Sequence, residues 1–537
     1  MREIIGKWNN LKRSIGNMPF WLIVFLILNL IAPGHAAGPK NRTIPIKNFQ
    51  KVFYVSIHTG QDIPTAGSRQ KPWRTIQYAI KNIPENSDIT KIAVLVSAGH
   101  YLINDLQLKK NIYLFGGFDE SFAKRDIFGQ ATILNGQSKG CILIPAINNL
   151  IDGFVFINGS TRGKGGAIFC QGVSPTISNN IFRANQTLAP TSWNPIYRHE
   201  IANDGGAIYV ENGAHPVLKN NLFIDNTTEV GRGAAIALHD HCAGVIKNNV
   251  FINNVSGVKD PKRSSDGGAV SIFKWSSPVV ENNIFLNNKA KNSNDGGGLF
   301  VALWSSPELK NNIFVGNYGD DDGGALFIGG QEHRYDKPND TMPPENAFFV
   351  RIVDNMFFGN SNASANSGVM RLTMETRGVF ENNICAFNTG VYFQRSEMTI
   401  KRNIFFDNVL CIETRKWLKP YEIDNNYFFG KFLLTAPANQ DNNWKYKETP
   451  DSNVPIFFND RFEVACWSAT FNSALHQTII FAPDLNVKKD ALKNRVVNAN
   501  GRWGVVETNE ANFIYVWGKL ENVQQLIVLP SYRLLKK

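Results

Sequence analysis

A short phrase, Asn-Asn-(Ile/Leu/Val)-Phe-x-x-Asn, recurs along this chain and constrains its fold more than any other feature. The phrase begins at Asn179, Asn220, Asn248, Asn282 and Asn311, and degenerate copies begin at Asp354, Asn382, Arg402 and Asn425. A second phrase, Gly-Gly-Ala-(Ile/Val/Leu), precedes it and begins at Gly165, Gly205, Gly267 and Gly323, with variants at Gly233 and Gly296. From Gly206, Ala234, Gly268 and Gly297 to the second Asn of the next pair is always 15 residues. Each repeat therefore has a rigid part and a loop that tolerates insertions.

Short strands separated by Gly and Asn turns, with no room for a helix between them, are typical of a solenoid. Asn and Gly accept the left-handed backbone of a sharp bend. Stacked coils place equivalent residues about 4.8 Å apart, so we expect the second Asn of each pair to form a hydrogen-bonded ladder. The Phe residues should form one buried column, namely Phe182, Phe223, Phe251, Phe285 and Phe314. A β-propeller needs blades of about 40–45 residues, whereas Asn383 and Asn403 lie only 20 apart.

At these residues the chain resembles known families. Gly-Gly-Ala-Ile paired with Phe-x-x-Asn is similar to the repeat of the chlamydial polymorphic outer-membrane proteins, surface β-helices implicated in adhesion. Residues 53–56 and 72–80 resemble the first coil of secreted bacterial pectate-lyase-like proteins, and residues 113–118 resemble a later coil of that group. The resemblance covers roughly residues 52–450 and implies fold more than function. The chain lacks the long C-terminal run of alternating membrane strands that a self-inserting autotransporter needs.

The predicted fold is all-β, a right-handed parallel β-helix with a short N-terminal capping helix and a small C-terminal β module. We expect a signal peptide over 1–37, a linker over 38–51, the β-helix over 52–455 and the C-terminal cap or module over 456–537. The helix is expected from Thr75 to Asn82, and the module is expected to cover the open end of the solenoid.

The first 37 residues have the pattern of an export signal, with basic residues, an apolar stretch from Phe20 to Ala32, and small residues ending at Ala37. The apolar stretch is shorter than the about 20 residues of a membrane span, although an uncleaved anchor is the alternative. The sequence therefore predicts a secreted, periplasmic or cell-surface protein with no further transmembrane segment.

The formal charge of +11 is spread along the chain rather than gathered in a basic arm, which argues against nucleic acid as a partner. Six cysteines lie far apart without metal-type spacing: Cys141, Cys170, Cys242, Cys385, Cys411 and Cys466. One or two disulfides are possible in an oxidising compartment. Buried small apolar residues are favoured, because Cys385 stands where other repeats have Phe.

A column of charged residues lies two positions before the second Gly of each coil: Lys164, Asp204, Arg232, Asp266, Asp295 and Asp322. The last three are carboxylates, which repel at ladder spacing unless they fan out into water or share a cation. Oxygen clusters of this kind suit Ca²⁺, so Asp266, Asp295 and Asp322 are the candidate metal ligands. The alternative is that Asp before Gly-Gly only caps turns in a solvated loop.

Trp275 and Trp304 occupy matched positions before Ser-Ser-Pro in adjacent coils, and His241 occupies the same position one coil earlier. Stacked aromatic rings on a solenoid face would form a platform for sugar rings. Plain packing beneath the loop at 329–347 is the alternative. The phrase His239-Asp240-His241 resembles a metal pair only by composition.

These features favour an exported surface or envelope protein that binds polysaccharide, or another envelope partner, along the solenoid. A calcium-assisted polysaccharide lyase or glycoside hydrolase near Asp266–Asp322 is the alternative. Arg351, Arg371 and Arg377 would then supply its positive group. The phrases typical of pectate lyases and of β-helix polygalacturonases are absent, and no catalytic residue can be assigned.

Overall fold

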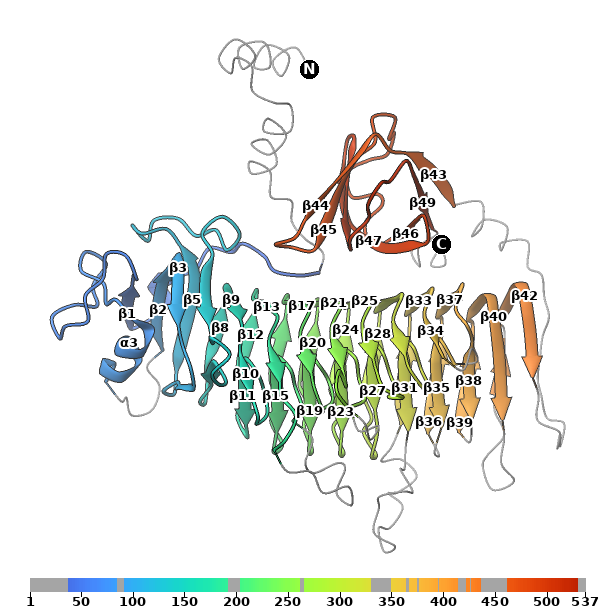
Figure 1. Cartoon of the computed structure of the whole chain (residues 1–537), viewed down its shortest axis with the longest axis horizontal. Helices are drawn as coiled ribbons and strands as arrows, with labels where there is room; N and C mark the ends of the chain where they lie inside the picture. Colours follow the sequence, from blue (N-terminus) through green and yellow to red (C-terminus); the bar gives the residue numbers. More distant parts are fainter. Residues whose placement is uncertain are drawn as a thin grey trace, which may run out of the picture. The chain divides into compact units, whose positions relative to one another are not determined.

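Short parallel strands stack coil upon coil from β1 to β42 in sequence order (Figure 1). The computed structural model describes residues 37–84, 91–191, 203–260, 265–329, 349–363, 367–373, 376–394, 396–413, 422–424, 426–435 and 461–529. Residues 1–36, which hold nearly all of the predicted signal peptide, and the predicted domain boundary near 455 lie outside them.

One sheet of 13 parallel strands runs along the solenoid. Its strands are β1 (Lys51–Val55), β2 (Ile92–Ser97), β5 (Ile112–Phe118), β8 (Leu150–Asp152), β12 (Thr176–Ser178), β16 (Val217–Lys219), β20 (Val245–Lys247), β24 (Val279–Glu281), β28 (Glu308–Lys310), β32 (Val350–Val353), β36 (Arg377–Glu381), β39 (Glu397–Lys401) and β41 (Glu422–Asp424). A sheet of seven two-residue strands holds β10 (Ser160–Thr161), β14 (Gln186–Thr187), β18 (Thr227–Thr228), β22 (Val255–Ser256), β26 (Lys289–Ala290), β30 (Tyr318–Gly319) and β34 (Ser361–Asn362).

Two further ladders of parallel strands meet at β40. The first, here called the Asn–Phe ladder, contains β3 (Gly99–Leu102), β6 (Thr132–Asn135), β9 (Phe154–Ile157), β13 (Ile181–Arg183), β17 (Leu222–Ile224), β21 (Val250–Ile252), β25 (Ile284–Leu286), β29 (Ile313–Val315), β33 (Met356–Phe358), β37 (Ile384–Ala386), β40 (Ile404–Glu413) and β42 (Tyr427–Thr435). The second, here called the Gly–Ala ladder, contains β4 (Leu106–Gln107), β7 (Leu143–Ile144), β11 (Ile168–Gln171), β15 (Ile208–Glu211), β19 (Ile236–His239), β23 (Val270–Phe273), β27 (Leu299–Val301), β31 (Leu326–Gly329), β35 (Met370–Thr373) and β38 (Val391–Gln394).

The predicted Phe column is confirmed. Phe182, Phe223, Phe251, Phe285 and Phe314 have no exposed surface, and successive rings stack with centroids 4.5–5.0 Å apart. Phe156 and Phe357 extend the column at its two ends. Strands pair in register, so each ring lies directly over the next and the column fills the interior.

The two residues of each Asn pair have different structural roles. The first takes the left-handed bend, with φ of 54° at Asn248 and 56° at Asn282. The second is buried and belongs to the predicted ladder: Asn249 Nδ2 donates to Asn283 Oδ1 (3.1 Å) and to the carbonyl of Leu218 (2.9 Å). The same Asn283 oxygen also accepts the backbone N–H of Asn249 at 2.9 Å. The Asn at the end of each phrase forms a second ladder of the same kind, as at Asn254 and Asn288.

Gly267 and Gly268 of one coil show why the repeat has two adjacent glycines. Gly267 has φ of 78°, where a side chain would be strained. A Cβ on Gly268 would lie 2.1 Å from the carbonyl oxygen of Gly297 in the next coil. The two glycines therefore permit the bend and the close approach of successive coils.

The predicted N-terminal helix is confirmed as α3 (Ile76–Asn82), the one α-helix among the residues described. Thr75 is its N-cap, and the Thr75 side chain accepts the N–H of Tyr78. Ile76, Ala79 and Ile80 are buried and join the main hydrophobic core. The amphipathic pattern of this segment thus places its apolar face on the first coils.

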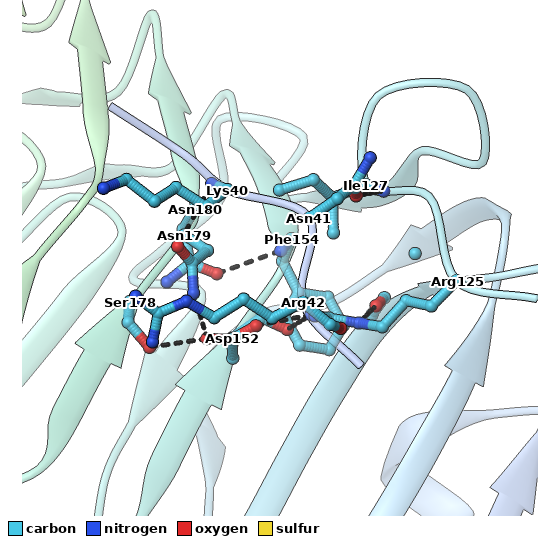
Figure 2. Close-up of polar contacts among 12 residues, drawn as sticks. Lys40, Asn41, Arg42, Arg125, Ile127, Asp152, Phe154, Ser178, Asn179 and Asn180 are labelled. Carbon is cyan, nitrogen blue, oxygen red and sulfur yellow. Dashed lines mark hydrogen bonds and ion pairs between the residues drawn. The ribbon is translucent and has the colours of Figure 1, made fainter. Parts of the chain in front are cut away.

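Residues at the start of the described chain are tied to the solenoid by polar contacts (Figure 2). Asn179 Oδ1 accepts the N–H of Lys40 at 3.1 Å, and the Arg125 guanidinium donates to the carbonyl of Arg42 at 3.1 Å. Arg125 also pairs with the buried Asp152 (2.5 Å), whose other oxygen accepts the Ser178 hydroxyl at 2.6 Å. The segment that we expected to be a linker therefore has specific contacts with the coils.

The small C-terminal β module is confirmed as a seven-stranded antiparallel sheet in the order β43-β49-β46-β47-β48-β45-β44. Its strands are β43 (Phe462–Ala465), β44 (Ser468–Asn472), β45 (Gln477–Phe481), β46 (Val496–Ala499), β47 (Arg502–Glu510), β48 (Phe513–Trp517) and β49 (Gln525–Val528). Val505 and Trp517 belong to one buried apolar cluster with Ile284, Leu286 and Ile313 of the Asn–Phe ladder. The module therefore packs on outward-facing residues of that ladder, and a role in covering the open solenoid end stays a prediction.

The cysteines behave as buried apolar residues wherever their side chains are described. Cys141, Cys170, Cys242, Cys385 and Cys466 are buried and unpaired, and the side chain of Cys411 lies outside the described set. Burial raises the pKa of Cys141 to about 12 and that of Cys242 to about 11. Cys385 stacks in the Phe column between Phe357 and Phe405, as its position in the repeat indicated.

Candidate functional site

An aromatic ladder, made of His241, Trp275 and Trp304, lies at one turn of three successive coils. The His241 and Trp275 rings are 6.4 Å apart and nearly parallel, at 7°. The Trp275 and Trp304 rings are 6.2 Å apart and tilted by 37°. All three residues have left-handed backbone, with φ of 58–60°, because each lies two or three residues after a strand, at the same sharp turn.

The three rings differ in exposure. Trp275 is 40% exposed and the His241 side chain is 67% exposed, whereas Trp304 is 7% exposed. We expected both tryptophans to be side by side and exposed. They lie side by side, but only Trp275 offers a ring face to a ligand, and Trp304 supports it from the adjacent coil.

Serine ladders fix the turn beneath these rings. The Ser276 hydroxyl accepts the N–H of Cys242, and the Ser305 hydroxyl accepts the N–H of Ser276, each at 3.1 Å. One coil further on, Phe349 is 43% exposed and donates its N–H to Ser306 Oγ at 3.2 Å. Sequence reasoning missed Phe349 as a surface aromatic, because nothing in its local pattern distinguishes it from a buried strand residue.

The charged column lies at the turn that precedes the Gly–Ala ladder, and its carboxylates bond to the next coil. Asp266 Oδ1 accepts the N–H of Asp295, and Asp295 Oδ1 accepts the N–H of Asp322, both at 2.9 Å. Asp322 accepts the Ser367 hydroxyl at 2.9 Å and pairs with the guanidinium of Arg371. The sequence predicts either splayed carboxylates or convergence on a cation, and in addition Asp266 and Asp295 each accept a backbone N–H of the next coil.

Within the described ranges, Asp295, Asp321 and Asp322 have ligand atoms within 4.8 Å of one another. Asp266 is not in this group. Of the three arginines considered for an enzyme site, Arg371 pairs with Asp322 of the column. Arg351 lies 3.8 Å from Glu308, and Arg377 lies 3.0 Å from Glu397. A calcium site here stays a prediction.

Two members of this column, Asp204 and Arg232, belong to a buried polar cluster. Asp204 Oδ2 lies 3.1 Å from His239 Nδ1 and 3.1 Å from a guanidinium nitrogen of Arg232. His239 Nε2 lies 3.2 Å from the Ser271 hydroxyl. His239 and His241, adjacent to the same Asp240, therefore have different surroundings, and only the exposed His241 bonds to Asp240, at 2.9 Å.

The electrostatics of this cluster follow from burial and pairing. Burial lowers the pKa of His239 to about 4, against the attraction of Asp204. Burial alone would raise the pKa of Asp204, but the adjacent Arg232 and His239 hold it well below its usual range. At neutral pH the cluster therefore contains a carboxylate, a guanidinium and a neutral imidazole.

Comparison with known proteins agrees with this architecture. Residues 124–317 match the family described as "Right handed beta helix region". The fold is a right-handed parallel β-helix. No curated protein matches the chain. A solved structure titled "Geobacillus virus E2 - ORF18" is similar over 88% of this chain and 78% of that chain, with 9% identity and a TM-score of 0.27. So low a TM-score carries no information about this β-helix or its function.

No helix within the described ranges is both long and apolar enough to cross a bilayer.

Proposed function

We propose that this β-helix protein is exported and binds a polysaccharide through its aromatic ladder, with Trp275 as the main contact. The exposed face of Trp275 is the observation that carries the proposal, because a stable fold does not require a large apolar ring at a solvated turn. The near-parallel His241 ring extends this surface toward the preceding coil.

Sugar rings have C–H faces that pack on aromatic rings, and aromatic stacking contributes about 0.5–1.5 kcal/mol beyond the buried area. The ring spacings of 6.2 and 6.4 Å follow the solenoid axis, so a glycan chain would lie along that axis across successive coils. Hydroxyl groups of Ser277 and Ser306, at the neighbouring turn positions, would accept or donate hydrogen bonds at its edge.

Export is supported by the basic and apolar pattern of residues 1–37. Another envelope component remains the alternative partner, and a lyase or hydrolase at the carboxylate column is the alternative activity. The direct pairing of Arg371 with Asp322 already neutralises part of that column, which favours binding over calcium-assisted cleavage.

A glycan array probed with the full mature chain tests the proposal. We expect binding to at least one polysaccharide, and we expect Trp275→Ala to weaken it by roughly 2- to 10-fold, the equivalent of one stacking interaction. Trp467→Ala is the matched control, because Trp467 is 74% exposed but lies on the C-terminal module. Equal losses in both variants, or no binding to any glycan, would contradict the proposal.

A further inference from the structure

Asp204, His239 and Ser271 form a line of three hydrogen-bonded side chains on the outer side of the Gly–Ala ladder. The Asp204 carboxylate lies 3.1 Å from His239 Nδ1, and His239 Nε2 lies 3.2 Å from Ser271 Oγ. Acid, imidazole and hydroxyl at these distances are the components of an activated serine nucleophile.

The register of the coils explains how the three residues meet. Asp204 belongs to the turn before β15, His239 ends β19, and Ser271 lies in β23. Ala237 pairs with Ser271 and His239 pairs with Phe273, so His239 and Ser271 are diagonal neighbours on one face. At the position of Ser271, the coils on either side have Phe169, Tyr209, Ala237, Phe300 and Phe327. The solenoid therefore does not need a hydroxyl there.

The contacts also set the tautomer of the imidazole. Nδ1–H donates a hydrogen bond to the ionised Asp204. Nε2 therefore carries the lone pair and accepts a hydrogen bond from the Ser271 hydroxyl. Arg232 pairs with Asp204 and packs 4.3 Å from the ring centre of Phe273, which keeps the carboxylate charged inside the cluster. The imidazole is neutral at neutral pH, as a general base must be.

We propose that Ser271 is the nucleophile of an acyl-transfer site, that His239 is its general base, and that Asp204 positions the imidazole. The substrate is a carboxylic ester. Trp275 follows Ser271 by four residues and His241 follows His239 by two, so the site and the aromatic ladder share the same coils. An acyl ester on a bound polysaccharide is therefore the substrate class that fits, and this last step rests on the proposed function.

The reaction is an ester hydrolysis and needs no reagent besides water. Ser271 Oγ attacks the ester carbonyl carbon while His239 Nε2 takes the hydroxyl proton. The bond to the alkoxy oxygen breaks, and His239 returns the proton to the leaving alcohol. Water then attacks the acyl-serine, gives a proton to His239, and releases the carboxylic acid as Ser271 regains its hydrogen.

Ser271 has no exposed surface, and Asp204 and His239 are 2% and 4% exposed. Burial strengthens the hydrogen bonds of the line. It also means that a substrate reaches Ser271 only through a local opening of the outer face. We therefore expect a slow reaction whose rate depends on reagent size.

Labelling of the full mature chain with a small fluorophosphonate, followed by peptide mass spectrometry, tests the assignment. We expect one serine adduct, at Ser271, and a loss of labelling rate of at least about a hundredfold in His239→Gln, the range of general-base catalysis. Ser97→Ala is the control, since Ser97 is an equally buried serine in β2, outside these coils, with its hydroxyl near Ala98 and Tyr101, and it should label at the wild-type rate. The labelling rate should also fall as pH decreases toward 4.

Absence of an adduct at Ser271 in the folded wild-type chain would overturn the proposal, and so would labelling that His239→Gln leaves unchanged while the variant melts as the wild type does. The reagent needs no glycan. A chain that is labelled but binds no polysaccharide therefore contradicts only the proposed function, and one that binds but is not labelled contradicts only the acyl-transfer site.

Discussion

Single residues of the repeated phrase each have one physical role. The first Asn of a pair, such as Asn282 with φ of 56°, provides the bend, and the second, such as Asn283, satisfies buried backbone groups of its neighbours. Asn283 Nδ2 donates to the carbonyl of Ile246 at 2.8 Å and to Asn312 Oδ1 at 3.0 Å. The Phe that follows needs to be apolar and buried, and Cys385, smaller but apolar, occupies this position between Phe357 and Phe405.

Phe285→Ala tests the role of the column. Phe285 is fully buried between Phe251 and Phe314, so its truncation removes ring contacts on both sides and leaves a cavity. We expect the free energy of unfolding to fall by about 3–5 kcal/mol, measured by denaturant unfolding. Val279→Ala, at a half-buried position on the outer side of β24, is the control and should lose far less. Equal losses would contradict the account of the core.

The buried His239 makes stability depend on pH. Its pKa is about 4 in the folded chain against an ordinary 6.5, so between these values the unfolded chain binds more protons. Stability therefore decreases as pH falls from 6.5 to 4, by roughly 3 kcal/mol for such a shift. His239→Gln should flatten the dependence of the unfolding free energy on pH in this window. A wild-type stability independent of pH there would show that His239 is not desolvated.

At the scale of elements, the turns before the Gly–Ala ladder connect one coil to the next. Each carboxylate of Asp266 and Asp295 accepts the backbone N–H of the Asp one coil ahead. These bonds reduce the repulsion between stacked charges, and Arg371 reduces it further at the end of the series. The charged column therefore helps to hold successive coils together, and it is also a candidate ion site.

Calcium addition tests whether the charged column binds a metal ion. The ligand atoms of Asp295, Asp321 and Asp322 lie within 4.8 Å of one another, a separation that one hard cation can bridge. We expect Ca²⁺ to raise the melting temperature, and we expect Asp295→Asn to remove that rise. Asp240→Asn, at an exposed carboxylate outside the column, should retain it. A melting curve indifferent to Ca²⁺ and to a chelator would exclude the metal site and remove the cofactor of the lyase alternative.

At the scale of the whole molecule, the features that the sequence predicts are those that repeat. Phe285 and Asn283 recur at fixed spacing, and in-register stacking converts that spacing directly into a column and a ladder. Trp275 and Trp304 occupy matched positions, yet Trp275 is 40% exposed and Trp304 is 7% exposed, a difference that spacing alone does not predict. The contact of Asp204 with His239 joins non-equivalent positions of different coils. This contact depends on how far the two side chains extend across the outer face of the Gly–Ala ladder, and the repeat spacing in the sequence does not determine that.

The central claim is that a polysaccharide lies on the Trp275 ring, and the most direct measurement is oxidation of individual tryptophans with and without the ligand. N-bromosuccinimide oxidises accessible indole rings, and mass spectrometry of peptides reports each tryptophan separately. With a glycan that the array identifies, we predict that Trp275 is protected in proportion to its saturation while Trp467 is oxidised at an unchanged rate. Saturating glycan that leaves Trp275 as reactive as in the free protein would contradict the account.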